Sequence, residues 1–215
     1  TSPFTRPRGN IIRGNTYGLT TDLNGAWAIQ SELCEGTLIE GNTVQNMRGS
    51  FRTTNNGRIW TIGINSYADL NTTIRNNVVH AIHTTNGAEL YGILGSGGTG
   101  GAGTGLLIYN NMVYDLQNTS TTGNAAIEGM CLWSNVNNQI FYNTVYLSGT
   151  GANPQGVDAL ALYTSVTNTT LRNNIFVNFY KQIGGFTPTV LWANGILTSD
   201  YNDLCADTTL ANSYT

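Results

Sequence analysis

One short motif recurs along nearly the whole chain, and it constrains the fold more than any other feature. In this motif an asparagine stands three residues after a branched apolar residue and two residues before a second apolar residue, as around Asn42 between Ile39 and Val44. The repeated asparagines are Asn15, Asn42, Asn77, Asn111, Asn143, Asn174 and Asn202, and only the last copy is degenerate. Such regular recurrence in a chain of 215 residues indicates one repeated unit rather than several unrelated domains.

The residues between the motifs predict short strands. The pairs Asn24-Gly25, Asn56-Gly57 and Asn86-Gly87 each precede a short apolar stretch, and Asn-Gly supplies the positive φ angles of tight turns. The β-branched and aromatic residues that follow are typical of strands. No stretch combines an i, i+3, i+4 apolar pattern with helix caps, so we expect almost no helix.

Repeats this short cannot bury an apolar side alone, so they must stack. Two or three strands per repeat predict an all-β protein, a parallel β-solenoid of about seven coils, forming a single domain over residues 1–215. The motif asparagines would then form a hydrogen-bonded ladder of Asn42, Asn77, Asn111, Asn143 and Asn174. The alternative is a β-propeller, whose blades repeat at about 40 to 50 residues.

Composition excludes several functions. Hydrophobic residues make up 40% of the chain, which is enough for a core, whereas charged residues make up only 10%. A net charge of −3 with few, scattered cations argues against nucleic-acid binding. No apolar run reaches the roughly 18 residues of a membrane span, so none is expected.

Three carboxylates form the first candidate site. Counted from the turn glycines, Glu89, Glu128 and Asp158 take equivalent places at the start of a strand in three successive repeats. Stacked about 5 Å apart, such groups either keep a proton at a raised pKa or share a cation, and Ca²⁺ suits these oxygen ligands. Glycosidases also use carboxyl pairs at such separations. We expect these groups to accept turn N–H bonds, with a calcium site or catalysis as alternatives, and we expect no other cofactor.

Two outward columns form the second candidate site. Two residues before the ladder asparagine stand Arg75, Tyr109, Phe141 and Arg172, and three residues after it stand His80, Tyr114, Tyr146 and Val177. Aromatic faces at regular spacing can stack on the apolar faces of sugar rings, and Arg75 or Arg172 would contact a carboxylated sugar. The predicted glycan-binding residues are therefore Tyr109, Tyr114, Phe141, Tyr146, Arg75 and Arg172. Ordinary stacking between neighbouring strands is the competing interpretation.

The histidines and cysteines give weaker signals. His80 and His83 lack a convergent cysteine or carboxylate in the sequence, so we expect structural roles. The three cysteines, Cys34, Cys131 and Cys205, are separated by at least two predicted coils, which is too far for a disulfide, so free buried thiols are expected.

The chain resembles the right-handed parallel β-helix repeat family. The resemblance lies in the segments 142–149, 159–163 and 171–177. These segments are similar in particular to repeat regions of large secreted or surface proteins of Bacteroidetes-type bacteria. It implies a pectate-lyase-like solenoid. The family includes pectate lyases and polygalacturonases, as well as modules without demonstrated chemistry. The Asp-rich motifs typical of the polygalacturonases do not occur here.

These observations predict an extracellular or bacterial cell-surface structural or adhesive module. We expect it to be a portion or processed product of a longer chain, to bind polysaccharide, and to stack on neighbouring repeats or on further copies head to tail as a filament. The alternative is a carbohydrate-active enzyme of the polysaccharide-lyase or glycoside-hydrolase type acting on acidic polysaccharide. In that case Glu89, Glu128, Asp158 and Arg172 would be the catalytic candidates.

Overall fold

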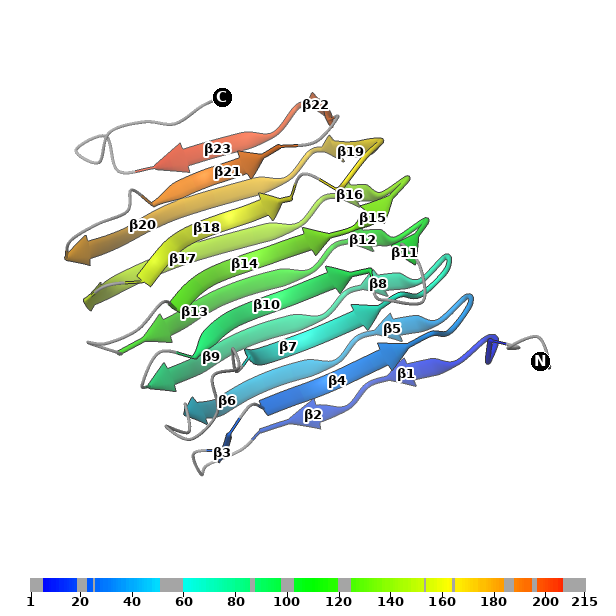
Figure 1. Cartoon of the computed structure of the whole chain (residues 1–215), viewed down its shortest axis with the longest axis horizontal. Coiled ribbons are helices and arrows are strands. Elements are labelled where there is room, and N and C mark those ends of the chain that lie inside the picture. The colour runs from blue at the N-terminus through cyan, green and yellow to red at the C-terminus, as the bar shows by residue number, and fades with distance from the viewer. Residues whose placement is uncertain are drawn as a thin grey trace.

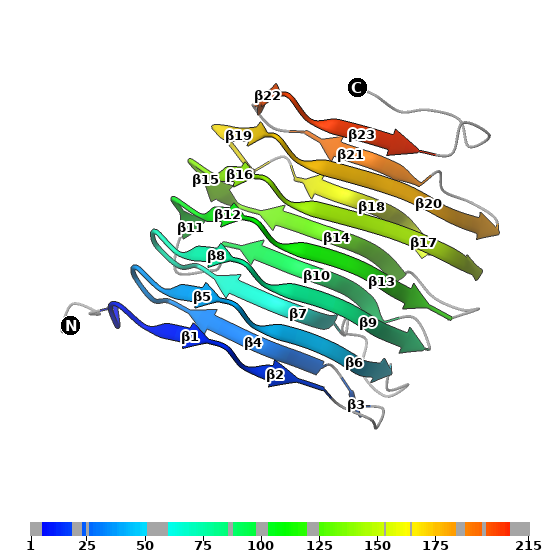
Figure 2. The same cartoon turned by 180° about the vertical axis from the view of Figure 1, so that it is seen from behind.

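The computed structural model consists of parallel strands wound into a solenoid (Figures 1 and 2). It describes residues 6–18, 23–24, 26–50, 60–85, 88–97, 103–119, 125–152, 154–163, 165–183, 188–194 and 197–206. The glycines of the three predicted Asn-Gly turns lie outside these residues. All elements in the described part are strands, so the expected scarcity of helix is confirmed. This part of the chain also holds no helix that could cross a membrane.

Three large sheets form the sides of the solenoid, and every strand pair in them is parallel. The seven-stranded sheet consists of β1 (Ile11–Arg13), β5 (Leu38–Glu40), β8 (Thr73–Arg75), β12 (Leu107–Tyr109), β16 (Gln139–Phe141), β19 (Thr169–Arg172) and β22 (Leu197–Asp200). The eight-stranded sheet consists of β2 (Thr16–Tyr17), β6 (Thr43–Ser50), β9 (Val78–Thr85), β13 (Met112–Asn118), β17 (Thr144–Ala152), β20 (Ile175–Ile183) and β23 (Asp203–Ala206), with β3 (Leu23–Asn24) added beside β6.

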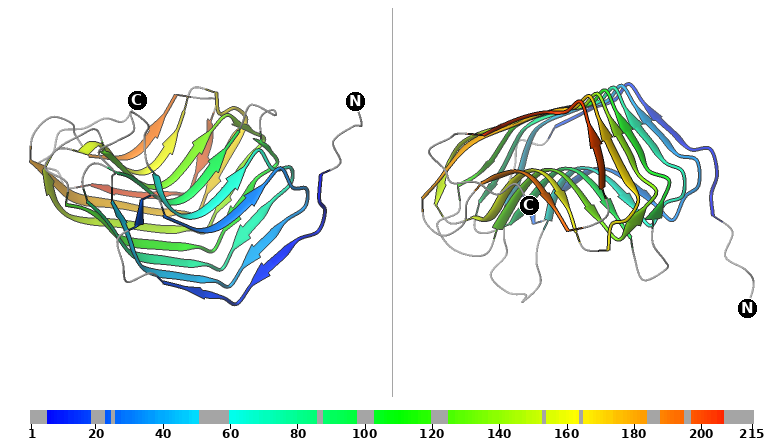
Figure 3. Two further views of the ribbon diagram at one scale, coloured as in Figure 1. Left: turned by 60° about the horizontal axis from the view of Figure 1, so that its bottom comes forward. Right: turned by 90° about the horizontal axis from the view of Figure 1, so that it is seen from above.

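The six-stranded sheet closes the third side. It consists of β4 (Ala26–Glu32), β7 (Trp60–Tyr67), β10 (Glu89–Ser96), β14 (Ala125–Trp133), β18 (Pro154–Leu162) and β21 (Thr189–Ala193). Two short strands, β11 (Gly103–Thr104) and β15 (Asn135–Val136), pair separately. Figure 3 shows from above how successive coils lie over one another.

The predicted fold class, an all-β parallel solenoid, is confirmed. The solenoid makes about five full turns, slightly fewer than the predicted seven coils. The difference lies at the ends, because the first coil supplies strands of only three and two residues to two sheets. Beyond β21, the described residues add no further strand to the six-stranded sheet.

The core is a narrow stack of apolar columns between the sheets. Ile39, Ile74, Ile108 and Ile140 are aligned residue by residue in neighbouring strands of the seven-stranded sheet, and all are fully buried. A second column in the eight-stranded sheet contains Val44, Val79, Val113, Val145 and Phe176. Each apolar residue therefore packs on the equivalent residue of the next coil, as the repeat predicted.

The corner between these two sheets uses two consecutive residues. The first has a positive φ angle between 52° and 65°, and it is Gly14, Gly41, Asn76, Asn110, Tyr142, Asn173 or Tyr201. Glycine and asparagine adopt this left-handed conformation most readily. The second is the motif asparagine, whose side chain turns into the corner. The sequences Gly-Asn and Asn-Asn therefore encode the corner directly.

The predicted asparagine ladder is confirmed. The side-chain oxygen of Asn77 accepts from both the backbone N–H and the side-chain amide of Asn42, at 2.9 and 3.0 Å. The same pair of hydrogen bonds joins Asn77 to Asn111, and it is repeated at each later rung as far as Asn202. Each amide also donates to a backbone carbonyl of the preceding coil, such as Asn77 to Ile39. These bonds satisfy polar groups that would otherwise be buried without partners.

All three cysteines are free thiols, as expected. The expectation that they are buried is correct only for Cys131. Cys34 is half-buried and Cys205 is exposed, because each lies in the first or the last coils, where fewer neighbours cover it.

Candidate functional site

Both predicted outward columns exist. In the seven-stranded sheet Arg75 pairs with Tyr109, Tyr109 with Phe141, and Phe141 with Arg172. In the eight-stranded sheet His80, Tyr114, Tyr146 and Val177 are aligned in the same way. The four predicted aromatic residues therefore lie in two adjoining coils, on either side of the ladder corner.

The two arginines of the first column differ in availability. The guanidinium of Arg75 forms an ion pair with Glu40, donates to the Tyr109 hydroxyl and lies 5.8 Å from the centre of that ring. These contacts hold Arg75 along the sheet, away from a ligand above it. Arg172 is exposed, and the described residues supply no ion-pair partner for it.

The second column continues into exposed apolar residues that the repeat did not reveal. His80 and Tyr114 stack face to face with ring centres 4.8 Å apart, and Tyr146 meets Phe179 edge-on at 6.2 Å. Tyr142, at the corner, is 60% exposed. It stands where most repeats have glycine or asparagine, and this departure was the signal that could have found it. We call the exposed and half-buried aromatic and apolar residues here the corner face: Tyr142, Tyr146, Ile175 and Phe179 are exposed, and Tyr109, Tyr114 and Phe141 are half-buried.

The three candidate carboxylates do not form one column, and that prediction was wrong. Glu128 pairs with Asp158 across β14 and β18, but the residue of β10 that pairs with Glu128 is Tyr91. Glu89 lies two residues earlier and pairs with Trp60. Counting from turn glycines failed because the connections before β10 and β14 differ in length, whereas register follows from packing of the strands.

Glu89 and Glu128 nevertheless lie buried beside a layer of aromatic rings on the outer face of the six-stranded sheet, and the half-buried Asp158 lies next to Glu128. The ring contacts run from Trp60 to Trp133 at 5.3 Å, from Trp133 to Tyr163 at 5.3 Å, and from Tyr163 to Trp192 at 4.7 Å. Below them the fully buried apolar residues are Ile62, Tyr91, Leu94, Cys131 and Ala161. The recurring pairs Leu132-Trp133 and Leu162-Tyr163 were the sequence signal for this second core.

Burial controls the chemistry of these carboxyl groups. Glu128 is 1% exposed, and loss of water raises its pKa to about 7, although the Cys131 thiol and the Tyr163 hydroxyl partly oppose the shift. Tyr163 donates to one Glu128 oxygen at 2.8 Å. Burial, and then the charge of Glu128, raise the pKa of Asp158, which accepts a hydrogen bond from Thr189. Glu128 therefore holds a proton up to about neutral pH, and Asp158 keeps its proton to a higher pH than an exposed aspartate does.

The structure does not assemble these groups into a metal centre. Within the described ranges, no group of three or more His, Cys, Asp or Glu residues is arranged to hold a metal ion. Glu89 instead accepts the Tyr91 hydroxyl at 2.8 Å. The arrangement can store protons within an aromatic second core.

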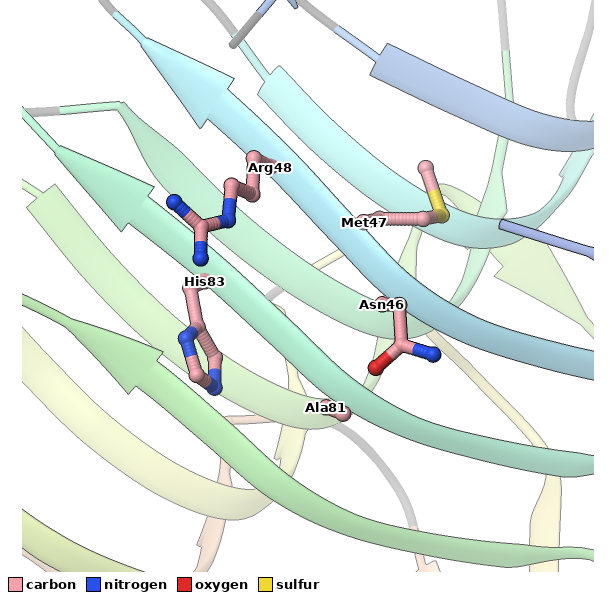
Figure 4. Close-up of a pocket in the computed structure, with 5 residues that line it drawn as sticks. All are labelled: Asn46, Met47, Arg48, Ala81 and His83. Carbon is pink, nitrogen blue, oxygen red and sulfur yellow. The ribbon is translucent and has the colours of Figure 1, made fainter. Parts of the chain in front are cut away.

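A small pocket lies on the outer face of the eight-stranded sheet (Figure 4). Its volume is about 210 Å³, and it is lined by Asn46, Met47, Arg48, Ala81 and His83 of β6 and β9. Asn46 and Ala81 have positive φ angles of 53° and 51°, so both strands bend at the same level while their register is kept. Arg48 and His83 pair in register, and their side chains project from neighbouring coils. Sequence reasoning assigned His83 a structural role and did not find this pocket.

Comparisons with known proteins add no assignment. No family model matches the chain, and neither the curated proteins nor the solved structures contain a match.

Proposed function

We propose that this chain is a structural and adhesive β-solenoid module that binds glycans on its corner face, outside the cell or on a bacterial surface. The observation that carries the proposal is the exposed aromatic surface there. Tyr142 is 60% exposed and Tyr146 is 40% exposed, and the neighbouring Ile175 and Phe179 are exposed as well. A contiguous apolar surface of this kind marks a site of interaction.

A glycan fits this surface better than a charged macromolecule does. Charged residues make up only 10% of the chain, and of the two arginines beside the corner face, Arg75 is paired with Glu40 and only Arg172 is exposed. Sugar rings offer apolar C–H faces to aromatic rings and hydroxyl groups to the polar residues beside them. The regular stacking of coils repeats the aromatic positions on successive levels, which suits a polymer of repeated rings.

The alternative of a carbohydrate-active enzyme has weaker support. Two of its three candidate acids, Glu89 and Glu128, are 3% and 1% exposed and lie in the aromatic layer, whereas Asp158 is half-buried. General acid–base catalysis requires the acid to come within hydrogen-bond reach of the substrate. Covered carboxyls favour a role in the second core.

Substitution of Tyr146 by alanine is expected to weaken binding at least tenfold to whichever polysaccharide the wild-type protein co-sediments with. The expectation follows from loss of a stacking surface of one ring. Co-sedimentation of the full chain with insoluble polysaccharides, followed by affinity measurements on the retained one, provides the test. Trp27→Ala is the matched control, because Trp27 is 52% exposed but belongs to the six-stranded sheet. Equal losses in both variants, or no retention of the wild-type protein, would refute glycan binding on the corner face.

End-to-end stacking is a second part of the proposal, supported by the two end coils. One outward column begins with Arg13 in the first coil and ends with Asp200 in the last described coil. At every rung the asparagine amide donates to the side-chain oxygen of the asparagine in the next coil. The amide of Asn202 would therefore donate to Asn15 of a following copy. A head-to-tail contact would therefore continue the ladder and pair opposite charges, and such a contact extends into a filament.

Asp200→Arg is expected to abolish concentration-dependent assembly, because it places two cations in contact at each junction. Combining it with Arg13→Asp should restore assembly by reversing both charges. Sedimentation velocity over a hundredfold range of concentration would measure this. Wild-type protein that remains monomeric throughout, or a double variant that behaves like Asp200→Arg, would contradict the stacking contact.

A further inference from the structure

The pocket between β6 and β9 combines a free cation with two further polar groups. Arg48 is exposed, and no carboxylate in the described part of the chain pairs with it. The side chains of Asn46 and His83 line the same pocket (Figure 4). An arginine guanidinium presents donors in a planar fork that matches an oxyanion. The side-chain amide of Asn46 and a protonated ring nitrogen of His83 can also donate.

We propose that this pocket binds an anionic substituent of a glycan, a carboxylate or a sulfate ester, between Arg48 and His83. The inference rests on the proposed glycan-binding function and names the charge that the glycan carries. Both residues occupy the same level in adjacent strands, so their functional groups can converge on one oxyanion. The pocket volume of about 210 Å³ accommodates one such group rather than a whole oligosaccharide.

The pocket lies on the same sheet as part of the aromatic surface. His80 lies three residues before His83 on β9, a distance of about 10 Å along an extended strand. Its ring stacks on Tyr114 of the corner face at 4.8 Å. A sugar chain that lies along these rings therefore brings a charged substituent of a neighbouring sugar within reach of Arg48.

The charged residues beside His83 differ between its two sides: a carboxylate lies on one side and the Arg48 guanidinium on the other. Asp115 approaches His83 to 3.9 Å from β13, and Gln117 donates to the same carboxylate at 2.7 Å. Asp115 lies on the side of His83 away from Arg48, because β9 separates β6 from β13. The Asp115 carboxylate therefore lies on the β13 side of the imidazole, and the Arg48 guanidinium lies on the β6 side.

Nuclear magnetic resonance of the arginine Nε–H groups tests the pocket directly. The full chain would be titrated with glucuronate, glucose 6-sulfate and glucose. We expect a saturable shift of the Arg48 signal with one or both anionic sugars and none with glucose. Glucuronate alone would identify a carboxylate, and glucose 6-sulfate alone a sulfate ester. Shifts that are equal for Arg48 and Arg8, or that do not saturate, would overturn the proposal.

Affinity measurements with two variants complete the test. Arg48→Gln is expected to weaken binding of the anionic sugar at least tenfold, whereas Arg8→Gln, at an exposed arginine that belongs to neither the pocket nor the outward columns, should leave it unchanged. The reverse result would overturn the pocket while leaving glycan binding intact. Conversely, sugar binding that depends on Arg48, without retention of any polysaccharide, would contradict the corner face and uphold the pocket.

Discussion

Replacement of Glu128 by glutamine is expected to remove most of a pH dependence of stability that the wild-type protein shows between about pH 4.5 and 7. The pKa of Glu128 is raised from 4.5 to about 7 in the folded protein, chiefly by burial. Between these values the folded state holds a proton that the unfolded state has lost. The free energy of unfolding therefore falls as pH rises through this window, by about 3 kcal/mol in total, and stays low above it.

Glutamine imitates the protonated acid. Its carbonyl oxygen can still accept the Tyr163 hydroxyl, and it carries no charge to desolvate. We therefore expect Glu128→Gln to be more stable than wild type at pH 8 and similar to it at pH 4.5. A shallower slope should remain in the variant, because the pKa of Asp158 is also raised.

Urea denaturation at pH values from 4.5 to 8.5 measures these differences. Glu35→Gln is the control, because Glu35 lies at the surface in an ion pair with Arg8 rather than beneath the aromatic layer. A wild-type profile that is flat over this range, or an unchanged slope in Glu128→Gln, would show that the Glu128 carboxyl is not held neutral by burial.

Substitution of Asn143 by alanine is expected to lower the free energy of unfolding by about 4 kcal/mol. The Asn143 side chain accepts two bonds from Asn111. It also donates to the carbonyls of Ile108 and Phe141 and to the side chain of Asn174. Alanine removes all five bonds and leaves buried donors and acceptors without partners, and the site is 1% exposed, so water cannot replace them.

Asn202→Ala is the matched control for this prediction. Asn202 occupies the last rung of the ladder and is only half-buried. Water can therefore take the place of its side chain as partner of the Asn174 amide and the Leu171 carbonyl. We expect it to cost about 1 kcal/mol. Equilibrium denaturation of both variants tests the difference. Similar losses at the two positions would mean that burial does not determine the strength of the ladder.

The corner sequence explains why so much of the fold could be predicted. A residue that tolerates positive φ, followed by an asparagine, recurs with apolar residues at fixed distances on either side. In a parallel stack each residue lies beside its equivalent in the next repeat, so the columns of Ile74 and Val79 follow directly from the alignment. The same logic correctly placed the outward residues Tyr109 and Tyr146, because they lie within a few residues of Asn111 and Asn143.

Prediction failed where connections of unequal length intervene. Glu89 and Glu128 are separated from their ladder asparagines by segments of different length, so sequence distance no longer gives register. The bend at Asn46 and Ala81, where the pocket forms, also leaves no periodic signal in the residue types of the sequence. It results from how β6, β9 and the neighbouring β13 bend together, and β17 does not share the positive φ angle.

The sequence alone determined the all-β class, the stacking of repeats, the asparagine ladder and the apolar columns beside it. These features depend on contacts between equivalent residues, which a repeat specifies by itself. Only the tertiary structure decided that Glu128 and Asp158 lie beside one aromatic layer and that Arg48 and His83 line one pocket. The members of each pair stand at equivalent positions, but the burial and charge around them also depend on residues elsewhere in the repeat and exist only once the coils have packed.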